Sequence, residues 1–181
     1  MRPLLRRTRP TLTPADRERL DLRRGDDLLS ELPLPALQSR LVVTTWHLVL
    51  LPDAGTPVLR PWHLVDGAGW SRDDSTLRVS WVDGDEPWRL AVAEPDARAL
   101  QALRERVQAS VVAHDDTAAG GGRVRVVIRQ DLATRELLVQ TLYAGGARPD
   151  DPAVRAAREQ MAARLRDAVG LPPQPGGSPG A

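Results

Sequence analysis

Short apolar runs broken by turn residues follow one another from Asp26 to Val92. The runs are rich in Val, Leu, Thr and Trp, and stretches of Pro, Gly, Asp and Ser separate them. Runs of this length and spacing are typical of an antiparallel meander. The pattern predicts five strands, near residues 27–32, 40–51, 57–66, 76–82 and 87–93.

The fourth run shows the strand period most clearly, because Leu77, Val79 and Trp81 alternate with residues of the opposite face. Such alternation indicates a strand with one buried and one solvated side.

After the last of these strands, the spacing of the apolar residues changes. Leu100, Leu103 and Val107 repeat at helical spacing, which predicts an amphipathic helix over residues 95–108 that covers an open end of the sheet.

Three further strands are expected near residues 110–113, 123–129 and 137–143, either extending the first sheet or forming a second one. Gly120, Gly121 and Gly122 mark the turn between the first two. An Ala- and Arg-rich helix follows from about residue 152 to Gly170, and the tail, residues 171–181, is expected to be disordered.

The N-terminal part carries a strong positive charge. Residues 1–24 hold eight arginines against three acidic residues, a net of +5, whereas residues 25–181 have a net of −4. Thr13, Pro14 and Asp16 are typical of a helix N-cap and first turn. We expect a basic arm with a short, exposed helix that ends before Gly25.

The residue types that are missing exclude several chemistries. All 25 basic residues are Arg, which we attribute to high-GC codon usage, and the 181-residue chain has no Lys and no Cys. A Schiff-base enzyme and a Walker A loop both need Lys. Thiolate catalysis, disulfides, iron–sulfur clusters and Cys-based zinc sites all need Cys. The chain length fits one domain with extensions.

No apolar run near the start has the length of a signal peptide, and the longest apolar run, near residues 41–51, is too short to span a bilayer. We expect a cytoplasmic protein without a transmembrane segment.

Several segments carry a resemblance. The chain resembles a group of uncharacterised actinobacterial proteins with a bacterial pleckstrin-homology-like (PH-like) domain in four segments: RLVVTTWHLVLL, PWHLVDGAGW, LRVSWVDG and RERVQASVV. Two later segments resemble the C-terminal part of that group: GGGRVRVVIRQD and DDPAVRAARE. The resemblance implies an α+β fold: an antiparallel, partly open PH-like β-barrel capped by a helix, with a C-terminal β-meander and helix. It implies a binding or scaffolding module rather than an enzyme.

The expected organisation is a basic arm with a short helix (1–25), a PH-like domain (26–115), C-terminal strands and a helix packed on it (116–170), and the tail (171–181). A fold shared by many functions does not assign one. A protein partner, bound in part through the arm and the C-terminal helix, is the leading expectation.

The five tryptophans allow two interpretations. Indole rings stack on ligands and bases. However, the chain has no Phe, so tryptophan must supply most of the large aromatic volume of the core. Core packing is the favoured interpretation, and whether Trp62 and Trp70 line a pocket is left open.

Other candidate sites are weaker. His47, His63 and Asp66 would form a two-His, one-carboxylate metal site if their strands pair. Ser71 or Ser110 with a histidine and an Asp would form a hydrolase triad, but the sequence lacks the G-x-S-x-G nucleophile elbow that such a triad needs. The glycines at Gly67 and Gly69 are interpreted as a turn. We therefore expect no catalytic residue, no metal ligand and no cofactor.

The arm supplies the remaining candidate site. Its arginines would contact anionic lipid headgroups or nucleic-acid phosphates in a salt-dependent way. The expected binding residues are Arg2, Arg6, Arg7, Arg9, Arg17, Arg23 and Arg24, with Arg19 between them.

Overall fold

The chain divides into two compact units. The computed structural model describes residues 12–172, and within this range the first unit comprises residues 12–109 with 132–134. The second unit comprises residues 110–131 and 135–172. Arg2, Arg6, Arg7, Arg9 and most of the C-terminal tail lie outside the described residues.

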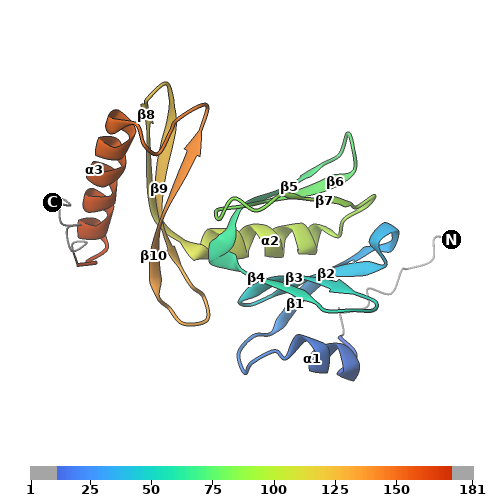
Figure 1. Cartoon of the computed structure of the whole chain (residues 1–181). Coiled ribbons are helices and arrows are strands. Elements are labelled where there is room, and N and C mark those ends of the chain that lie inside the picture. The colour runs from blue at the N-terminus through green and yellow to red at the C-terminus, as the bar shows by residue number, and fades with distance from the viewer. Residues whose placement is uncertain (1–11, 173–181) are drawn as a thin grey trace. The chain divides into compact units, whose positions relative to one another are not determined.

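A four-stranded antiparallel sheet opens the first unit, in the order β1-β2-β3-β4 (Figure 1). Its strands, with a 3₁₀ turn η1 after the first, are β1 (Leu28–Leu34), η1 (Pro35–Leu37), β2 (Ser39–Thr44), β3 (His47–Pro52) and β4 (Val58–Pro61).

The single strand predicted over 40–51 is wrong, because the chain reverses at Thr45 and Trp46 to form the β2–β3 hairpin. The Thr45 N–H donates to the Asp27 carbonyl, and the Trp46 N–H donates to the Asp26 carboxylate. Residues far along the chain therefore hold the turn. The turn contains no Gly or Pro, so no local signal in the sequence marks it.

A three-stranded antiparallel sheet follows, in the order β5-β6-β7. A second 3₁₀ turn precedes it, and the elements are η2 (Trp62–Leu64), β5 (Val65–Ser71), β6 (Thr76–Trp81) and β7 (Trp88–Ala91). The predicted β6 and β7 and the hairpin turns on either side of β6 are confirmed. The strand predicted over 57–66 is wrong, because it breaks at η2. Gly67 and Gly69 lie within β5, paired with Ser80 and Arg78, and do not form a turn.

One apolar core joins both sheets of the first unit. It contains Leu41 and Leu48 from the first sheet and Val79 from the second. Helix α2 (Ala97–Ser110) adds Ala99 and Leu103, both buried. The helix lies between the two sheets (Figure 1). The predicted amphipathic helix is confirmed, with its ends two residues later in the chain.

Helix α1 (Pro14–Leu20) buries one face, through Asp16 and Leu20, whereas an exposed helix was expected. Leu20 and Leu12, each 2% exposed, pack with Val42, Val49 and Leu51 on the face of the first sheet opposite the main core. The apolar residues of β2 and β3 point alternately to both faces, and α1 covers the outer one (Figure 1). Thr13 is the N-cap, as predicted, in a capping box with Asp16.

The second unit is a three-stranded antiparallel sheet, in the order β10-β9-β8, with one helix against it (Figure 1). Its elements are β8 (Val111–Ala119), β9 (Gly122–Gln130), β10 (Leu137–Ala144) and α3 (Pro152–Ala168). Val126 and Ile128 of β9 pack against Met161 of α3. The C-terminal strands thus form a sheet of their own, and β8 ends six residues later than predicted because its polar half pairs with β9.

The described part of the chain is therefore an α+β fold of three separate antiparallel sheets and three helices, which do not close into a barrel. The expected boundary at residue 115 falls inside β8. Among residues 12–172, no helix combines the length and the apolar character needed to cross a membrane.

Candidate functional site

The tryptophans divide between the core and its margins. Trp62 is fully buried, and its indole N–H donates to the Thr44 carbonyl at 3.1 Å. Trp70 is half-buried against the same core and donates to the Val92 carbonyl at 3.0 Å. Both indoles thus have their polar atom paired and their apolar faces packed. Core packing, the favoured interpretation, is confirmed for Trp62 and Trp81.

An arginine lies over the aromatic pair at the margin of this core. Trp81 and Trp88 meet edge to face, with ring centroids 4.7 Å apart, and the Arg60 guanidinium lies 4.4 Å from the Trp81 ring centroid. Arg60 also donates to Asp83 at 2.5 Å and to Asp85 at 2.6 Å. The guanidinium is therefore occupied by two carboxylates and an indole, and it fastens β4 to the β6–β7 turn.

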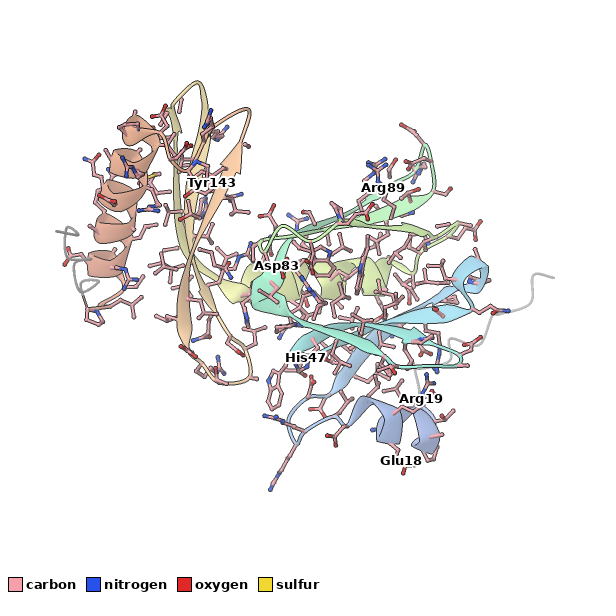
Figure 2. The ribbon with its side chains drawn as sticks, in the orientation of Figure 1. Glu18, Arg19, His47, Asp83, Arg89 and Tyr143 are labelled. Carbon is pink, nitrogen blue, oxygen red and sulfur yellow. The ribbon has the colours of Figure 1, made fainter. Side chains whose placement is uncertain are left out.

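His47 is half-buried and contacts a buried carboxylate. Its Nδ1 lies 2.7 Å from Oδ2 of Asp26, whose side chain is 1% exposed. The other carboxylate oxygen accepts the Trp46 N–H at 2.9 Å. The cluster holds the β2–β3 turn against the chain entering β1, and His47 lies at the start of β3 (Figure 2).

The pKa of Asp26 reflects two opposed influences. Burial is the largest and would raise the pKa, but hydrogen bonds from His47, Thr44 and the Trp46 backbone together outweigh it. The pKa of Asp26 consequently lies below its ordinary value of 3.8, and the carboxylate is charged at neutral pH.

The proposed ligands His63 and Asp66 belong to different elements, the η2 turn and β5. Within residues 12–172 there is no group of three His, Cys, Asp or Glu side chains placed to hold a metal ion. The hydrolase alternative gains no geometric support either. Ser110 is buried and accepts a hydrogen bond from Arg129 at 3.0 Å.

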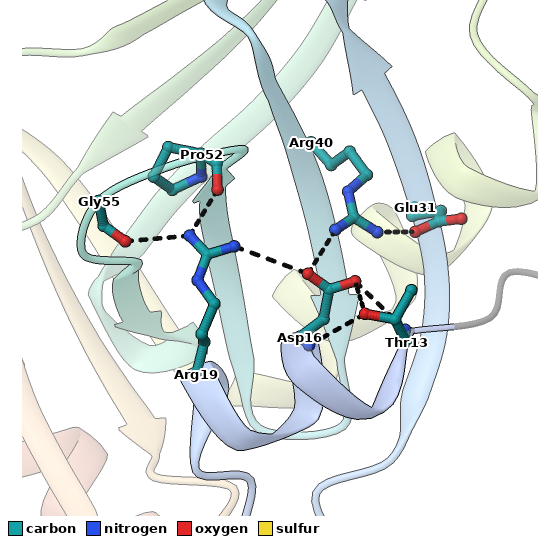
Figure 3. Close-up of polar contacts among 7 residues, drawn as sticks. All are labelled: Thr13, Asp16, Arg19, Glu31, Arg40, Pro52 and Gly55. Carbon is teal, nitrogen blue, oxygen red and sulfur yellow. Dashed lines mark hydrogen bonds and ion pairs between the residues drawn. The ribbon is translucent and has the colours of Figure 1, made fainter.

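The described arm residues separate into one anchor and three exposed cations. Arg19 donates to the carbonyls of Pro52 at 2.6 Å and Gly55 at 3.0 Å, so it ties α1 to the β3–β4 turn (Figure 3). Figure 2 shows Arg19 beside Glu18 on this helix. In contrast, Arg17, Arg23 and Arg24 are exposed and form no ion pair with any residue from 12 to 172.

A second buried carboxylate, Asp16, fixes α1 to the sheet. Arg40 of β2 lies 2.7 Å from Oδ1 of Asp16 and 3.4 Å from Glu31 of β1 (Figure 3). The Thr13 hydroxyl donates to Oδ2 of Asp16 at 2.8 Å. Hydrogen bonding from Arg40 is the largest influence on the pKa of Asp16 and lowers it below 3.8, with Thr13 adding to the effect and burial opposing it.

The sequence predicted the Thr13 N-cap but neither the Asp16–Arg40 ion pair nor the Asp26–His47 contact, because each joins residues more than 20 positions apart. The only sequence signal for these two contacts is the negative charge of Asp16 and Asp26. Asp16 and Asp26 flank an apolar sheet, where a buried carboxylate needs a donor.

Comparison with known proteins adds no relative: no family model, no curated protein and no solved structure matches the chain.

Proposed function

We propose that the chain is a non-catalytic PH-like module that binds a protein partner. One observation carries this proposal: a four-stranded sheet, a three-stranded sheet and the helix after them share a single core. That order is the one implied by the resemblance of residues 26–115 to PH-like domains. The same resemblance implies a binding or scaffolding module rather than an enzyme.

The polar clusters support a non-catalytic role. A catalytic constellation needs a nucleophile, acid or base whose polar atoms face a space that substrate can enter. In the described part of the chain, Asp16, Asp26 and Arg60 are each bonded to neighbouring elements. Their geometry fastens α1, the β2–β3 turn and the β6–β7 turn, which is the work of a rigid scaffold.

The experiment for this proposal depends on the position of α1. Deleting residues 1–24 would remove Leu12 and Leu20 and uncover Val42 and Val49. The arm variant therefore lacks only residues 1–11 and carries Arg17→Glu, Arg23→Glu and Arg24→Glu, which leaves the buried face of α1 intact.

Full-length protein and the arm variant are used to capture partners from lysate of the source organism at physiological salt. We expect one protein to be retained by both forms and to re-form a stoichiometric complex when purified. Absence of any such complex with either form would contradict the proposal.

Electrostatic docking to anionic lipid or nucleic acid is the second candidate. It is favoured by the exposure of Arg17, Arg23 and Arg24 next to residues 1–11, which contain four arginines and no acidic residue. Binding to phosphatidylserine vesicles or duplex DNA should then weaken with salt and be lost in the arm variant.

A matched control separates arm binding from a general charge effect. Arg89, Arg104 and Arg155 are also exposed, and replacing all three by Glu changes the net charge by the same amount as the three substitutions in the arm. This control is compared with full-length protein that carries only those three arm substitutions, because the arm variant also lacks the four arginines of residues 1–11. Docking through the arm predicts that this control still binds. Equal loss of binding in the control would rule out a specific role for the arm.

A further inference from the structure

The outer face of the β5-β6-β7 sheet is built mostly from small side chains. Leu77, Val79 and Leu90 of this sheet point into the core of the first unit, so the alternate positions point outward. These outward positions, strand by strand, are Gly67, Gly69 and Ser71 in β5, Thr76, Arg78 and Ser80 in β6, and Arg89 and Ala91 in β7. Apart from the two arginines, none of them has a side chain larger than that of threonine.

The fold itself does not explain the two glycines inside β5. Gly67 and Gly69 both pair with β6 and neither has a positive φ, so the backbone does not require glycine at either position. A Cβ on Gly69 would meet nothing within 4 Å, so packing does not require glycine there either. Glycine in a strand interior often marks a place where a ligand or a second backbone approaches closely. The space over Gly69 is therefore open to another molecule.

The two arginines stand directly opposite each other beside this open space. Gly69 pairs with Arg78, and Arg78 pairs with Arg89, so the three residues form one row across the sheet. All three are exposed, and Figure 2 shows Arg89 on the side of the sheet that faces away from α2. Like charges at directly opposite positions destabilise a sheet. An anion bound at this row would remove that repulsion.

One carboxylate in the adjoining turn offsets part of the positive charge. Nη2 of Arg78 lies 3.2 Å from Oδ2 of Asp74, and the two side chains are 52% and 46% exposed. An exposed pair of this kind is weak, and a guanidinium has five N–H donors, so Arg78 keeps donors for a second acceptor. Arg89 forms no ion pair with any residue from 12 to 172. The row therefore keeps a net positive charge and donors for an anionic partner.

We propose that this row binds an acidic segment of a protein partner. The inference rests on the proposed binding of a protein partner, and it names the surface used and the chemistry of that partner. Charge complementarity supports it, because carboxylates accept paired hydrogen bonds from guanidinium groups. In an extended segment, acidic residues two positions apart point to the same side, so both can face the row of Arg78 and Arg89.

The shape of the face favours a protein segment over a small molecule. Small-molecule sites enclose most of the ligand surface. In contrast, Gly69, Arg78 and Arg89 are all exposed. A main chain can lie close to β5 over Gly69, where no Cβ keeps it away, and its acidic side chains then reach the neighbouring strands.

Two matched peptides test the row without the partner itself. The first is Gly-Glu-Gly-Glu-Gly with both ends blocked, and the second has Gln in place of each Glu. Each peptide is titrated at low salt into isotopically labelled full-length protein and followed by heteronuclear NMR. We expect the backbone amide resonances of Gly69, Arg78 and Arg89 to shift saturably with the Glu peptide and to stay unchanged with the Gln peptide.

Two substitutions separate the contribution of charge from that of shape. Arg89→Gln removes the cation that has no ion pair, and the Kd of the Glu peptide should rise about tenfold. Gly69→Val keeps the charge and fills the open space, and it should weaken binding to a similar extent. Because a Cβ at Gly69 meets nothing within 4 Å and valine favours strands, this variant should fold normally. Arg104→Gln, exposed on α2, is the matched control and should leave the Kd unchanged.

Absence of a shift with the Glu peptide would overturn the proposal, and so would equal shifts with the Gln peptide or a Kd that neither variant raises. Equal shifts with sodium phosphate would overturn it in favour of a general anion site. A captured partner that Arg89→Glu protein retains equally well would also overturn it and leave the proposed function standing. A specific peptide response without any captured partner would support the row as a site and contradict only the proposed function.

Discussion

Arg40 of β2 and Asp16 of α1 meet with 2.7 Å between Nη2 and Oδ1, and this contact between residues 24 positions apart joins a helix to a sheet. The Asp16 side chain is 8% exposed and that of Arg40 26%. Arg40 is also the bridge to Glu31 of β1. The pair therefore anchors the start of the described chain to the first sheet.

Removing this arginine should destabilise the first unit. Arg40→Ala removes the nearer of the two cations of the buried Asp16 carboxylate and leaves only Arg19, at 3.7 Å. We expect a loss of about 2 kcal/mol in the free energy of unfolding. All five tryptophans lie in the first unit, so tryptophan fluorescence during urea unfolding measures the change. Arg78→Ala, which breaks an exposed pair with Asp74, is the control and should have no measurable effect.

The two buried carboxylates predict the response to acid. The pKa values of Asp16 and Asp26 are lowered in the folded chain, so the folded state binds fewer protons than the unfolded state. The two carboxylates contribute fully to stability above pH 3.8, the ordinary pKa of Asp. This contribution is lost as the pH falls through their lower pKa values in the folded state.

Asp16→Asn tests this dependence. The variant should be less stable than the unsubstituted protein at neutral pH, and its urea midpoint should change less as the pH is lowered below 3.8. Parallel pH profiles for the two proteins would contradict the assignment of acid sensitivity to Asp16.

Asp26 should be needed for the β2–β3 turn. Asp26→Ala removes the acceptor of His47 and of the Trp46 N–H, and we expect a loss of about 2 to 3 kcal/mol together with a shift in Trp46 emission. Asp27→Ala is the matched control. The Asp27 residue is exposed and contacts Thr45 through its backbone, so this variant should unfold like the unsubstituted protein.

Gly122 is required by the close approach of the loop after β10. A Cβ at this position would clash with the backbone N of Ala147 and the carbonyl of Ala144. Gly122→Ala should destabilise the second unit by about 3 kcal/mol or more. Hydrogen exchange of the β9 and β10 amides measures the loss. Gly69→Ala, where a Cβ meets nothing within 4 Å, should leave protection unchanged.

Local chemistry determined much of this fold from sequence alone. Strand alternation in β6, the helical repeat of Leu100 and Leu103, and the Thr13 cap each involve residues a few positions apart. Such signals are set by backbone geometry and short-range hydrogen bonding. For this reason the elements after Thr76 were predicted with small errors at their ends, apart from the length of β8.

The tertiary structure decided what depends on distant partners. The reversal at Trp46 relies on Asp26, and the burial of α1 relies on Val42 and Val49 of the sheet beneath it. The division into three sheets likewise depends on which edges pair. No local pattern specifies these features, because burial of a carboxylate or a helix face is favourable only when the matching donor or apolar surface has been brought alongside by the rest of the fold.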